Sequence, residues 1–97
     1  MRIIPDTDGF TIDRNRVVRD PEGEVKNTYI NGDGYITCSV RKPDKRWVTY
    51  GIHRLYMLAY HYPHGKDPAL LTVNHLDKDV TNNEDDNLEW ASTKLNN

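Results

Sequence analysis

One stretch of this sequence, between Thr72 and Asn97, concentrates side chains that can carry chemistry. It contains His75, directly preceded by Asn74, and most of its other polar residues are Asp or Asn. Single apolar residues separate these polar groups, and the anchor Leu88-Glu89-Trp90 follows them. A solvated loop can be equally polar, but it does not need a large apolar anchor at its end. The pattern therefore predicts a small polar site held by a hairpin.

His75 is the natural general base of this stretch, because a neutral imidazole can take a proton from water near pH 7. A lone histidine near a strand end is more often structural, but here it is surrounded by oxygen-bearing side chains. Hydrolysis of a phosphodiester needs a base and a cation that stabilises the developing negative charge. Amide oxygens of Asn74 and Asn96 could serve Mg²⁺, which takes few protein ligands and keeps several waters. This predicts a weak metal site that the substrate completes.

The elements expected around these residues are a strand, a polar loop, a second strand and the start of a helix. Residues 70–75 and 87–90 have strand composition, and residues 77–83 are rich in turn formers. Ser92 or Thr93 is the expected N-cap of a helix that begins at the end of the sequence.

The first half of the sequence predicts a small antiparallel sheet. Turn signals such as Asp8-Gly9 recur every few residues, and residues 42–46 read as a hairpin connection. Residues 35–40 alternate between polar and apolar positions, as a half-buried strand does. The segments with strand composition are residues 10–12, 16–18, 35–40 and 47–52.

Residues 52–62 predict one amphipathic helix, which Pro63 and Gly65 end. Its expected apolar face is formed by Leu55, Leu58, Ala59 and Tyr62. We therefore expect one domain of α+β class over residues 1–97, made of a β-rich platform (1–51), a helix (52–62) and a C-terminal unit (70–97).

The composition fits a small folded domain. The 97 residues are 36% apolar and 29% charged, and no run is long enough to span a membrane or act as a signal peptide. Cys38 is the single cysteine, which excludes an internal disulfide and a cysteine zinc site and fits a reducing cytoplasm.

Charge is unevenly distributed along the sequence. Residues 1–66 carry 11 Lys and Arg against 8 Asp and Glu, a net +3, whereas residues 67–97 carry 2 against 7, a net −5. A basic platform beside an acidic, Asn-rich end suits a polyanion held near a cation site. Two ordinary solvated surfaces would explain the same charges.

Four motifs in order resemble the HNH endonuclease family, in the branch common in bacteriophages and group I intron homing enzymes. They are Ile52-His53-Arg54-Leu55, Val73-Asn74-His75-Leu76-Asp77, Thr81-Asn82-Asn83 and Asp86-Asn87-Leu88-Glu89-Trp90. The resemblance covers about residues 35–97. It implies a C-terminal ββα-metal finger, in which a hairpin and a short final helix enclose one divalent cation, and an enzyme that nicks or cleaves DNA.

The resemblance also assigns roles to residues at matching positions. It implies that His75 is the general base and that Asn87 fixes the loop and orients this histidine. Asn74 and Asn96 match the metal ligands, with Mg²⁺ the expected ion and Mn²⁺ the alternative. Asn74 stands where many relatives have Asp, so the metal site is expected to bind weakly and to depend on substrate phosphate.

Further residues are expected to support the finger or contact DNA. Asp77 and Asn83 are expected to shape the loop, Trp90 with Leu88 to anchor the hairpin, and His53 to support the finger from the helix. Phosphate contacts are expected from a set of basic residues, each of which could equally be a solvated surface side chain: Arg41, Lys42, Lys45, Arg46 and Arg54.

Two alternatives stay open because the final helix of this family runs several turns past the position of Asn96, whereas the sequence ends at Asn97. The first is an inactive HNH-like module that binds DNA or a protein partner as a phage accessory factor. The second is self-association, or a protein partner, that completes the C-terminal helix. No membrane partner is expected, and the expected location is the cytoplasm, that of the host cell for a phage-encoded protein.

Overall fold

The structure, a computed structural model, describes residues 1–92 and has an α+β fold. One helix, α1 (Ile52–Tyr60), and two short 3₁₀ turns, η1 (Pro68–Leu70) and η2 (Asp85–Asn87), lie among the strands. Within the described residues the strands are β1 (Arg2–Ile3), β2 (Thr11–Ile12), β3 (Val18–Arg19), β4 (Tyr29–Ile30), β5 (Ile36–Arg41), β6 (Trp47–Gly51), β7 (Leu71–His75) and β8 (Leu88–Ser92).

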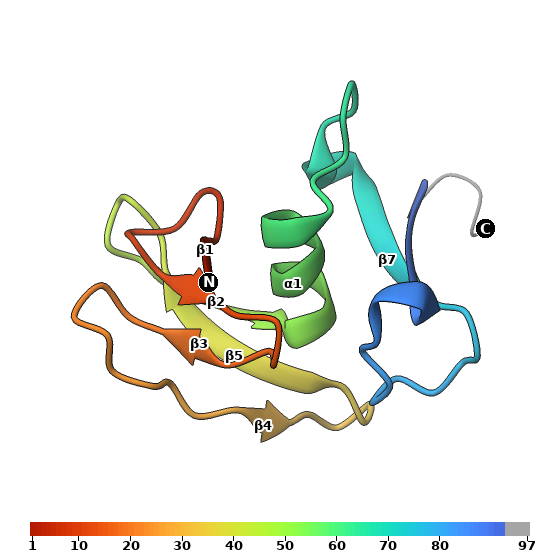
Figure 1. Cartoon of the computed structure of the whole chain (residues 1–97), viewed down its shortest axis with the longest axis horizontal. Coiled ribbons are helices and arrows are strands. Elements are labelled where there is room, and N and C mark those ends of the chain that lie inside the picture. Colours follow the sequence, from red (N-terminus) through yellow and green to blue (C-terminus); the bar gives the residue numbers. More distant parts are fainter. Residues whose placement is uncertain (93–97) are drawn as a thin grey trace.

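The strands form antiparallel sheets on two sides of the helix. One sheet has the order β1-β2-β3, a second β4-β5-β6, and β7 pairs with β8. Figure 1 shows α1 in the centre, with the first two sheets on one side and the β7–β8 hairpin on the other. The predicted antiparallel sheet and the α+β class are confirmed.

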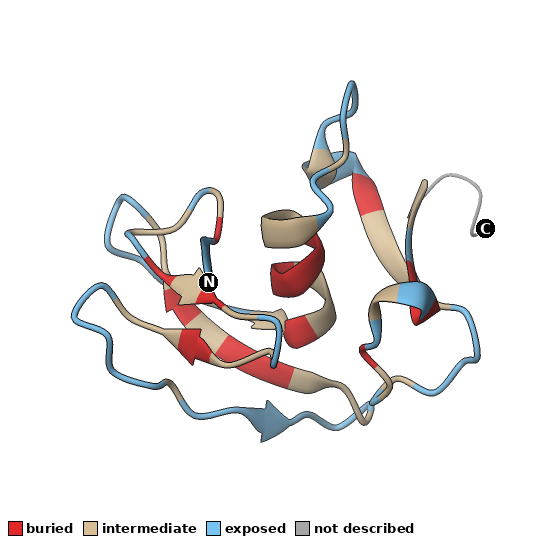
Figure 2. Ribbon diagram, in the orientation of Figure 1, coloured by how far each residue is buried: buried red, intermediate tan, exposed pale blue. Residues whose placement is uncertain are grey.

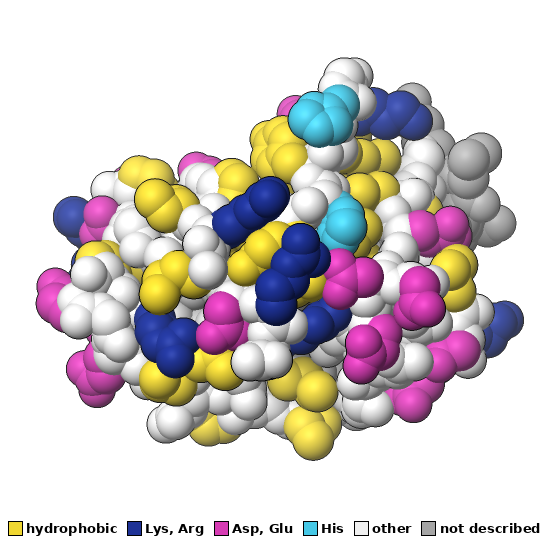
Figure 3. Space-filling model, in the orientation of Figure 1, with side chains coloured by type: hydrophobic (Ala, Val, Ile, Leu, Met, Phe, Trp, Pro, Cys, Tyr) yellow, Lys and Arg dark blue, Asp and Glu magenta, His cyan; other side chains and the backbone are white. Residues whose placement is uncertain are grey.

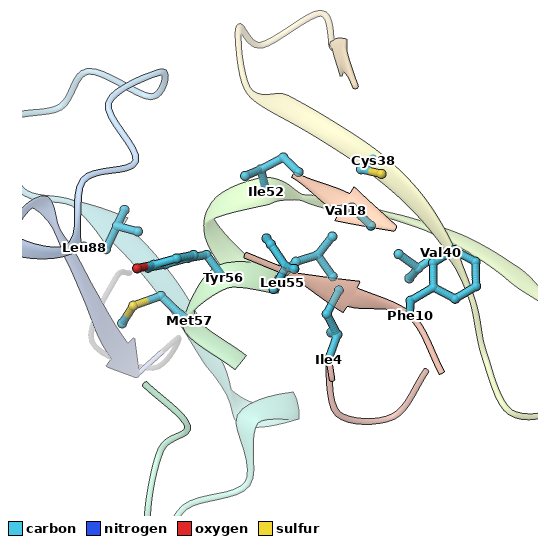
Figure 4. Packing of buried hydrophobic residues seen from close by; sticks show 11 residues of the cluster. Ile4, Phe10, Val18, Cys38, Val40, Ile52, Leu55, Tyr56, Met57 and Leu88 are labelled. Atoms are coloured by element: carbon cyan, nitrogen blue, oxygen red, sulfur yellow. The ribbon is translucent and has the colours of Figure 1, made fainter. Parts of the chain in front are cut away.

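The hydrophobic core lies where α1 meets the sheets (Figure 4). Buried positions follow β5 and the first turns of α1, whereas β4 is exposed (Figure 2). Burial of each large apolar side chain contributes roughly 1.5–3 kcal/mol. The buried cluster is Ile4, Phe10, Ile12, Val18, Cys38, Val40, Ile52, Leu55, Tyr56, Met57 and Leu88.

The helix differs from its prediction in length and in its buried face. It ends at Tyr60, because Pro63 disfavours helical backbone at Tyr62, whose residue surface is 43% exposed. The buried helical residues are Ile52, Leu55, Tyr56 and Met57 rather than the predicted set, of which Leu55 alone is buried. The buried face turns this way because the helix packs against β7 and Leu88 as well as against the N-terminal sheets.

Strand boundaries in the first half also differ from the prediction. Arg16 lies in a turn with φ 64°, so the third strand begins at Val18 instead of Arg16. The carboxylate of Asp13 fixes this turn by accepting hydrogen bonds from the backbone N–H groups of Asn15 (2.9 Å) and Val17 (3.1 Å). The two-residue strands β1 and β4 were not predicted.

The C-terminal unit follows the predicted order of strand, polar loop and strand. The second strand is longer than predicted, and Ser92 is its last residue. The predicted cap Thr93, the final helix and Asn96 lie outside the described residues. Within residues 1–92, no helix is long and apolar enough to cross a membrane.

Candidate active site

The register of the β7–β8 hairpin places Asn74 and His75 at the edge of a groove. His75 is the last residue of β7 and pairs with Leu88, which sets Asn74 opposite Glu89. The groove has a volume of about 470 Å³. Its lining residues are Tyr35, Val73, Asn74, His75, Leu76, Lys78, Val80 and Glu89.

Asn83 is the hydrogen-bond partner of the His75 ring. The distance between Nε2 of His75 and Oδ1 of Asn83 is 2.8 Å. An amide oxygen only accepts, so Nε2 carries the proton and Nδ1 keeps its lone pair. His75 is therefore held in the tautomer that leaves one basic nitrogen available.

Two aromatic rings pack against His75. Its centroid lies 4.7 Å from that of His53 and 5.8 Å from that of Tyr35, and the latter two are 5.2 Å apart. Burial, with the nearby His75 and Arg54, lowers the pKa of His53 to about 4. His53 is therefore neutral near pH 7, and its Nδ1 is buried with no hydrogen-bond partner among the described residues. His53 supports the His75 ring by packing, without adding a charge beside it.

Asn87 ties together the two ends of the polar loop. Its Oδ1 accepts from the backbone N–H of Asp77 (2.9 Å), and its Nδ2 donates to Oδ1 of Asp77 (2.9 Å) and the carbonyl of Asn82 (2.8 Å). Asn87 is buried, so these bonds fix the loop strongly. Within residues 1–92, Asn83 makes the side-chain hydrogen bond to His75, and the orientation of His75 by Asn87 stays a prediction.

Asp77 is the acceptor at the start of the same loop. Its carboxylate accepts from the backbone N–H of Asp79 (2.8 Å) and from Nδ2 of Asn82 (2.8 Å), besides the bond from Asn87. The hydrogen bond from Asn82 is the main cause that lowers the pKa of Asp77, followed by that from Asp79. The loop is thus organised by side chains that bond to its own backbone.

Asp85 joins the loop to the helix and to the N-terminal hairpin. It accepts from the hydroxyl of Tyr56 (2.8 Å) and pairs with Arg16 (2.9 Å), Arg14 (3.1 Å) and His61 (2.8 Å). Burial raises the pKa of Asp85, but hydrogen bonds from His61, Tyr56 and Arg16 outweigh burial and lower it to about 2. No local sequence pattern pointed to this cluster, which joins residues from three separate segments.

The residues expected to anchor the hairpin lie in the interface with α1. Leu88 is buried in the core, and Trp90 is half-buried and donates from Nε1 to the carbonyl of His61 (2.6 Å). Arg54 also holds this interface, because its guanidinium donates to the carbonyls of Leu71 (2.9 Å) and Pro68 (2.6 Å). A phosphate contact of Arg54 stays a prediction.

The other four basic residues predicted to contact DNA lie on or beside the β5–β6 hairpin, and each pairs with a carboxylate. Asp8 pairs with Arg41 (2.8 Å) and Lys45 (2.7 Å). Asp44 pairs with Arg46 (2.7 Å), and Asp6 pairs with Lys42.

A divalent cation fits the donor chemistry of the groove beside His75. Glu89, which the sequence analysis did not single out, faces Asn74 across the hairpin, where paired Cβ atoms lie about 5 Å apart. A carboxylate and an amide oxygen are ligands that suit Mg²⁺. No group of three or more His, Cys, Asp or Glu side chains that could enclose a metal lies within residues 1–92, so such an ion would rely on water and substrate oxygens. Only the strand register could have pointed to Glu89.

Comparison with known proteins found a solved structure that is similar to this chain. The chain is similar to a solved structure described as "DNA binding and cleavage by the HNH homing endonuclease I-HmuI", with a TM-score of 0.72 and 27% sequence identity. The match covers 98% of this chain and 53% of that chain, so this chain spans about half its length. No protein-family model and no curated protein matches the sequence. This chain therefore has an HNH-type fold.

Proposed function

We propose that this chain is a metal-dependent DNA endonuclease of the HNH type, with His75 as the general base. The observation that carries the proposal is the hydrogen bond from Nε2 of His75 to Asn83, which leaves Nδ1 basic at a groove shared with Asn74 and Glu89. The similarity to a homing endonuclease supports DNA as the substrate. The sequence motifs of the phage branch agree with this substrate.

The chain's own residues would carry the proton transfer. Nδ1 of His75 takes a proton from water as the water oxygen bonds to phosphorus and the bond to the leaving oxygen breaks. Asn83 holds the protonated Nε2 and so stabilises the imidazolium formed in this step. His53 stays neutral and adds no positive charge that would oppose it.

A divalent cation, Mg²⁺ or alternatively Mn²⁺, would supply stabilisation of the negative charge that develops on the phosphate and the leaving oxygen. Among the described residues, Asn74 and Glu89 are positioned to hold it. Asn96, which lies outside them, is the further ligand that the motif implies. The neutral amide of Asn74 makes this site weak on its own.

The basic residues of the β5–β6 hairpin would contact the DNA backbone. Where both side chains of a pair are exposed, the carboxylate is a weak competitor, because such ion pairs contribute only about 0–1 kcal/mol. The pair of Arg46 and Asp44 is an example, with side chains that are 70% and 56% exposed. A DNA phosphate could therefore replace the carboxylate at such a position.

A plasmid-nicking assay with Mg²⁺ or Mn²⁺ tests the proposal. We expect wild-type protein to convert supercoiled plasmid to the nicked or linear form, and His75→Ala to lose this activity while its circular dichroism is unchanged. His64→Ala is the matched control, because His64 is exposed in the loop after α1. Supercoiled plasmid that persists with wild-type protein, or full activity in His75→Ala, would overturn the proposal.

A module that binds DNA or a protein partner without cutting is the second candidate. The acidic side chains that gather over the β7–β8 hairpin and its loop favour the form that binds a protein, because they repel DNA from the groove (Figure 3). Persistent supercoiled plasmid together with tight binding to DNA or protein would select this candidate. A light-scattering mass of one chain would exclude a self-associated form.

A further inference from the structure

We propose that Arg16 is a positioning residue for the general base. Its guanidinium fixes the backbone of Asn83, and the side chain of Asn83 in turn fixes the ring of His75. The catalytic part of this inference rests on the proposed function, whereas the effect on the His75 ring can be measured without activity.

The first link is a double hydrogen bond between residues far apart in the sequence. Nε and Nη2 of Arg16 both donate to the carbonyl oxygen of Asn83, at 3.0 and 2.6 Å. A guanidinium is planar and presents its donors in a fixed fork, so two bonds restrain both the position and the orientation of the carbonyl. The carbonyl belongs to the loop between β7 and β8, and Arg16 to the hairpin between β2 and β3.

Arg16 can restrain Asn83 because its own side chain is restrained by further contacts. Nη2 also donates to Oδ1 of Asp85 (2.9 Å), and the guanidinium carbon lies 4.0 Å above the ring of Tyr56. Its side chain is 21% exposed. The backbone of Arg16 is fixed as well, in the turn that Asp13 organises.

The second link is the hydrogen bond between Asn83 and His75. Asn83 is buried, at 9% exposure, and its Oδ1 lies 2.8 Å from Nε2 of His75. Since the carbonyl of Asn83 is fixed by Arg16, its amide has little freedom to turn away. The N-terminal hairpin thereby selects the tautomer in which Nδ1 is free.

A purely structural role for Arg16 predicts different behaviour. If Arg16 only tied the hairpin to the loop, its loss would lower stability and leave the remaining folded molecules with an unchanged His75. If it positions the base, the folded protein itself changes. The experiment therefore needs readouts in the folded state and a variant that weakens the same hairpin elsewhere.

Nitrogen NMR of the His75 ring is the first readout, in the full chain without metal or DNA, at a fixed pH of about 8. We expect wild-type protein to show the Nε2–H tautomer, and Arg16→Ala and Asn83→Ala to show a mixture of both tautomers. Arg19→Ala is the matched control, because Arg19 pairs with Asp13 in the same hairpin (3.0 Å) and should leave the ring unchanged. An unchanged tautomer in folded Arg16→Ala would overturn the inference.

Kinetics of DNA nicking is the second readout. We expect kcat of Arg16→Ala to fall by about 10²-fold, the effect of a small misplacement of a catalytic group, with KM nearly unchanged. The variant Arg16→Ala/Asn83→Ala should lose no more activity than Asn83→Ala, since both act through one chain of contacts. Additive losses, or a change confined to KM, would contradict the inference.

Arg16→Lys covers the case in which Arg16→Ala does not fold. Lysine keeps the charge beside Asp85 but cannot make the double hydrogen bond, so a partial tautomer change and an intermediate kcat are expected. Wild-type values in Arg16→Lys would count against the inference. If Arg16→Ala changes the tautomer of His75 but wild-type protein does not nick DNA, the positioning contact is supported and the proposed function is refuted.

Discussion

Gly51 lies directly beneath the ring of His53, so closely that a Cβ at Gly51 would stand 2.2 Å from Cε1 of His53. Such a distance is far below van der Waals contact, and the ring would have to move. Because His53 packs against His75, the absence of a side chain at Gly51 helps to set the position of the proposed base.

Gly51→Ala should therefore reduce DNA nicking. We expect the His53 ring to be displaced and kcat to fall by at least about tenfold, since small shifts at a catalytic group are costly. Gly32→Ala is the control, because no heavy atom lies within 4 Å of a Cβ at that position. Equal activity of the two variants would show that the ring position does not matter. The measurement is kcat in the plasmid assay, with the ring shifts followed by NMR.

The free energy of unfolding should rise with pH across the weakly acidic range because of His53. Its pKa falls from 6.5 in the unfolded chain to about 4 in the folded chain, so between these values the unfolded chain binds more protons. This contribution is complete above pH 6.5 and is lost as pH falls through about 4. Urea unfolding at pH 4.5, 5.5 and 7 measures the slope. We expect His53→Phe, which keeps a ring but cannot titrate, to have a shallower slope than His64→Phe, the control in the exposed loop.

Asn87→Asp should destabilise the loop although it preserves shape. The new carboxylate can still accept from the backbone of Asp77 but can no longer donate to the Asp77 carboxylate or the Asn82 carbonyl. The new carboxylate is then buried beside the exposed anion of Asp77, and a loss of about 2–4 kcal/mol in the free energy of unfolding is expected. Asn27→Asp, at an exposed position, adds the same charge and should cost little. Chemical denaturation of both variants measures this difference. Similar denaturant concentrations at the midpoint of unfolding would refute the role of Asn87 in the loop.

Glu89→Gln should weaken binding of the divalent cation. The change removes the charged oxygen opposite Asn74 and leaves two neutral amides, so we expect the Mn²⁺ concentration for half-saturation to rise by about tenfold. Electron paramagnetic resonance of free Mn²⁺ measures this without substrate. Glu84→Gln is the charge-matched control in the loop that precedes β8 and should bind as wild type does. Identical titrations of the two variants would remove Glu89 from the metal site.

Local pattern predicted the order of elements well. Residues 35–40, which alternate, correspond to β5, and the apolar anchors Leu88 and Trp90 lie in β8. These strands could be predicted because the alternation of a half-buried strand involves only residues that are neighbours in the sequence. The buried side of α1 was predicted less well, because it depends on which elements pack against the helix from both sides.

Contacts between distant residues could not be predicted in the same way. The sequence offered Asn82, Asn83 and Asn87 as similar amides, and only the folded loop shows that Asn83 reaches His75. Arg16 lies 67 positions before its partner Asn83, and nothing in its neighbourhood distinguishes it from Arg14 or Arg19. Glu89 became visible once the strand register was known.

The carboxylates paired with the basic β5–β6 hairpin bear on how the protein would respond to ionic strength. A free cation that meets DNA releases condensed counterions, which gives a slope of about 0.9 per neutralised phosphate in the logarithm of affinity against salt. At Arg41, Lys42, Lys45 and Arg46 an internal anion must be displaced first. When the hairpin binds DNA, a phosphate would thus replace a carboxylate at each of these side chains. The affinity for DNA would therefore fall less steeply with salt concentration than it would for four unpaired cations. The same internal anions would keep the hairpin from adhering to nucleic acid indiscriminately.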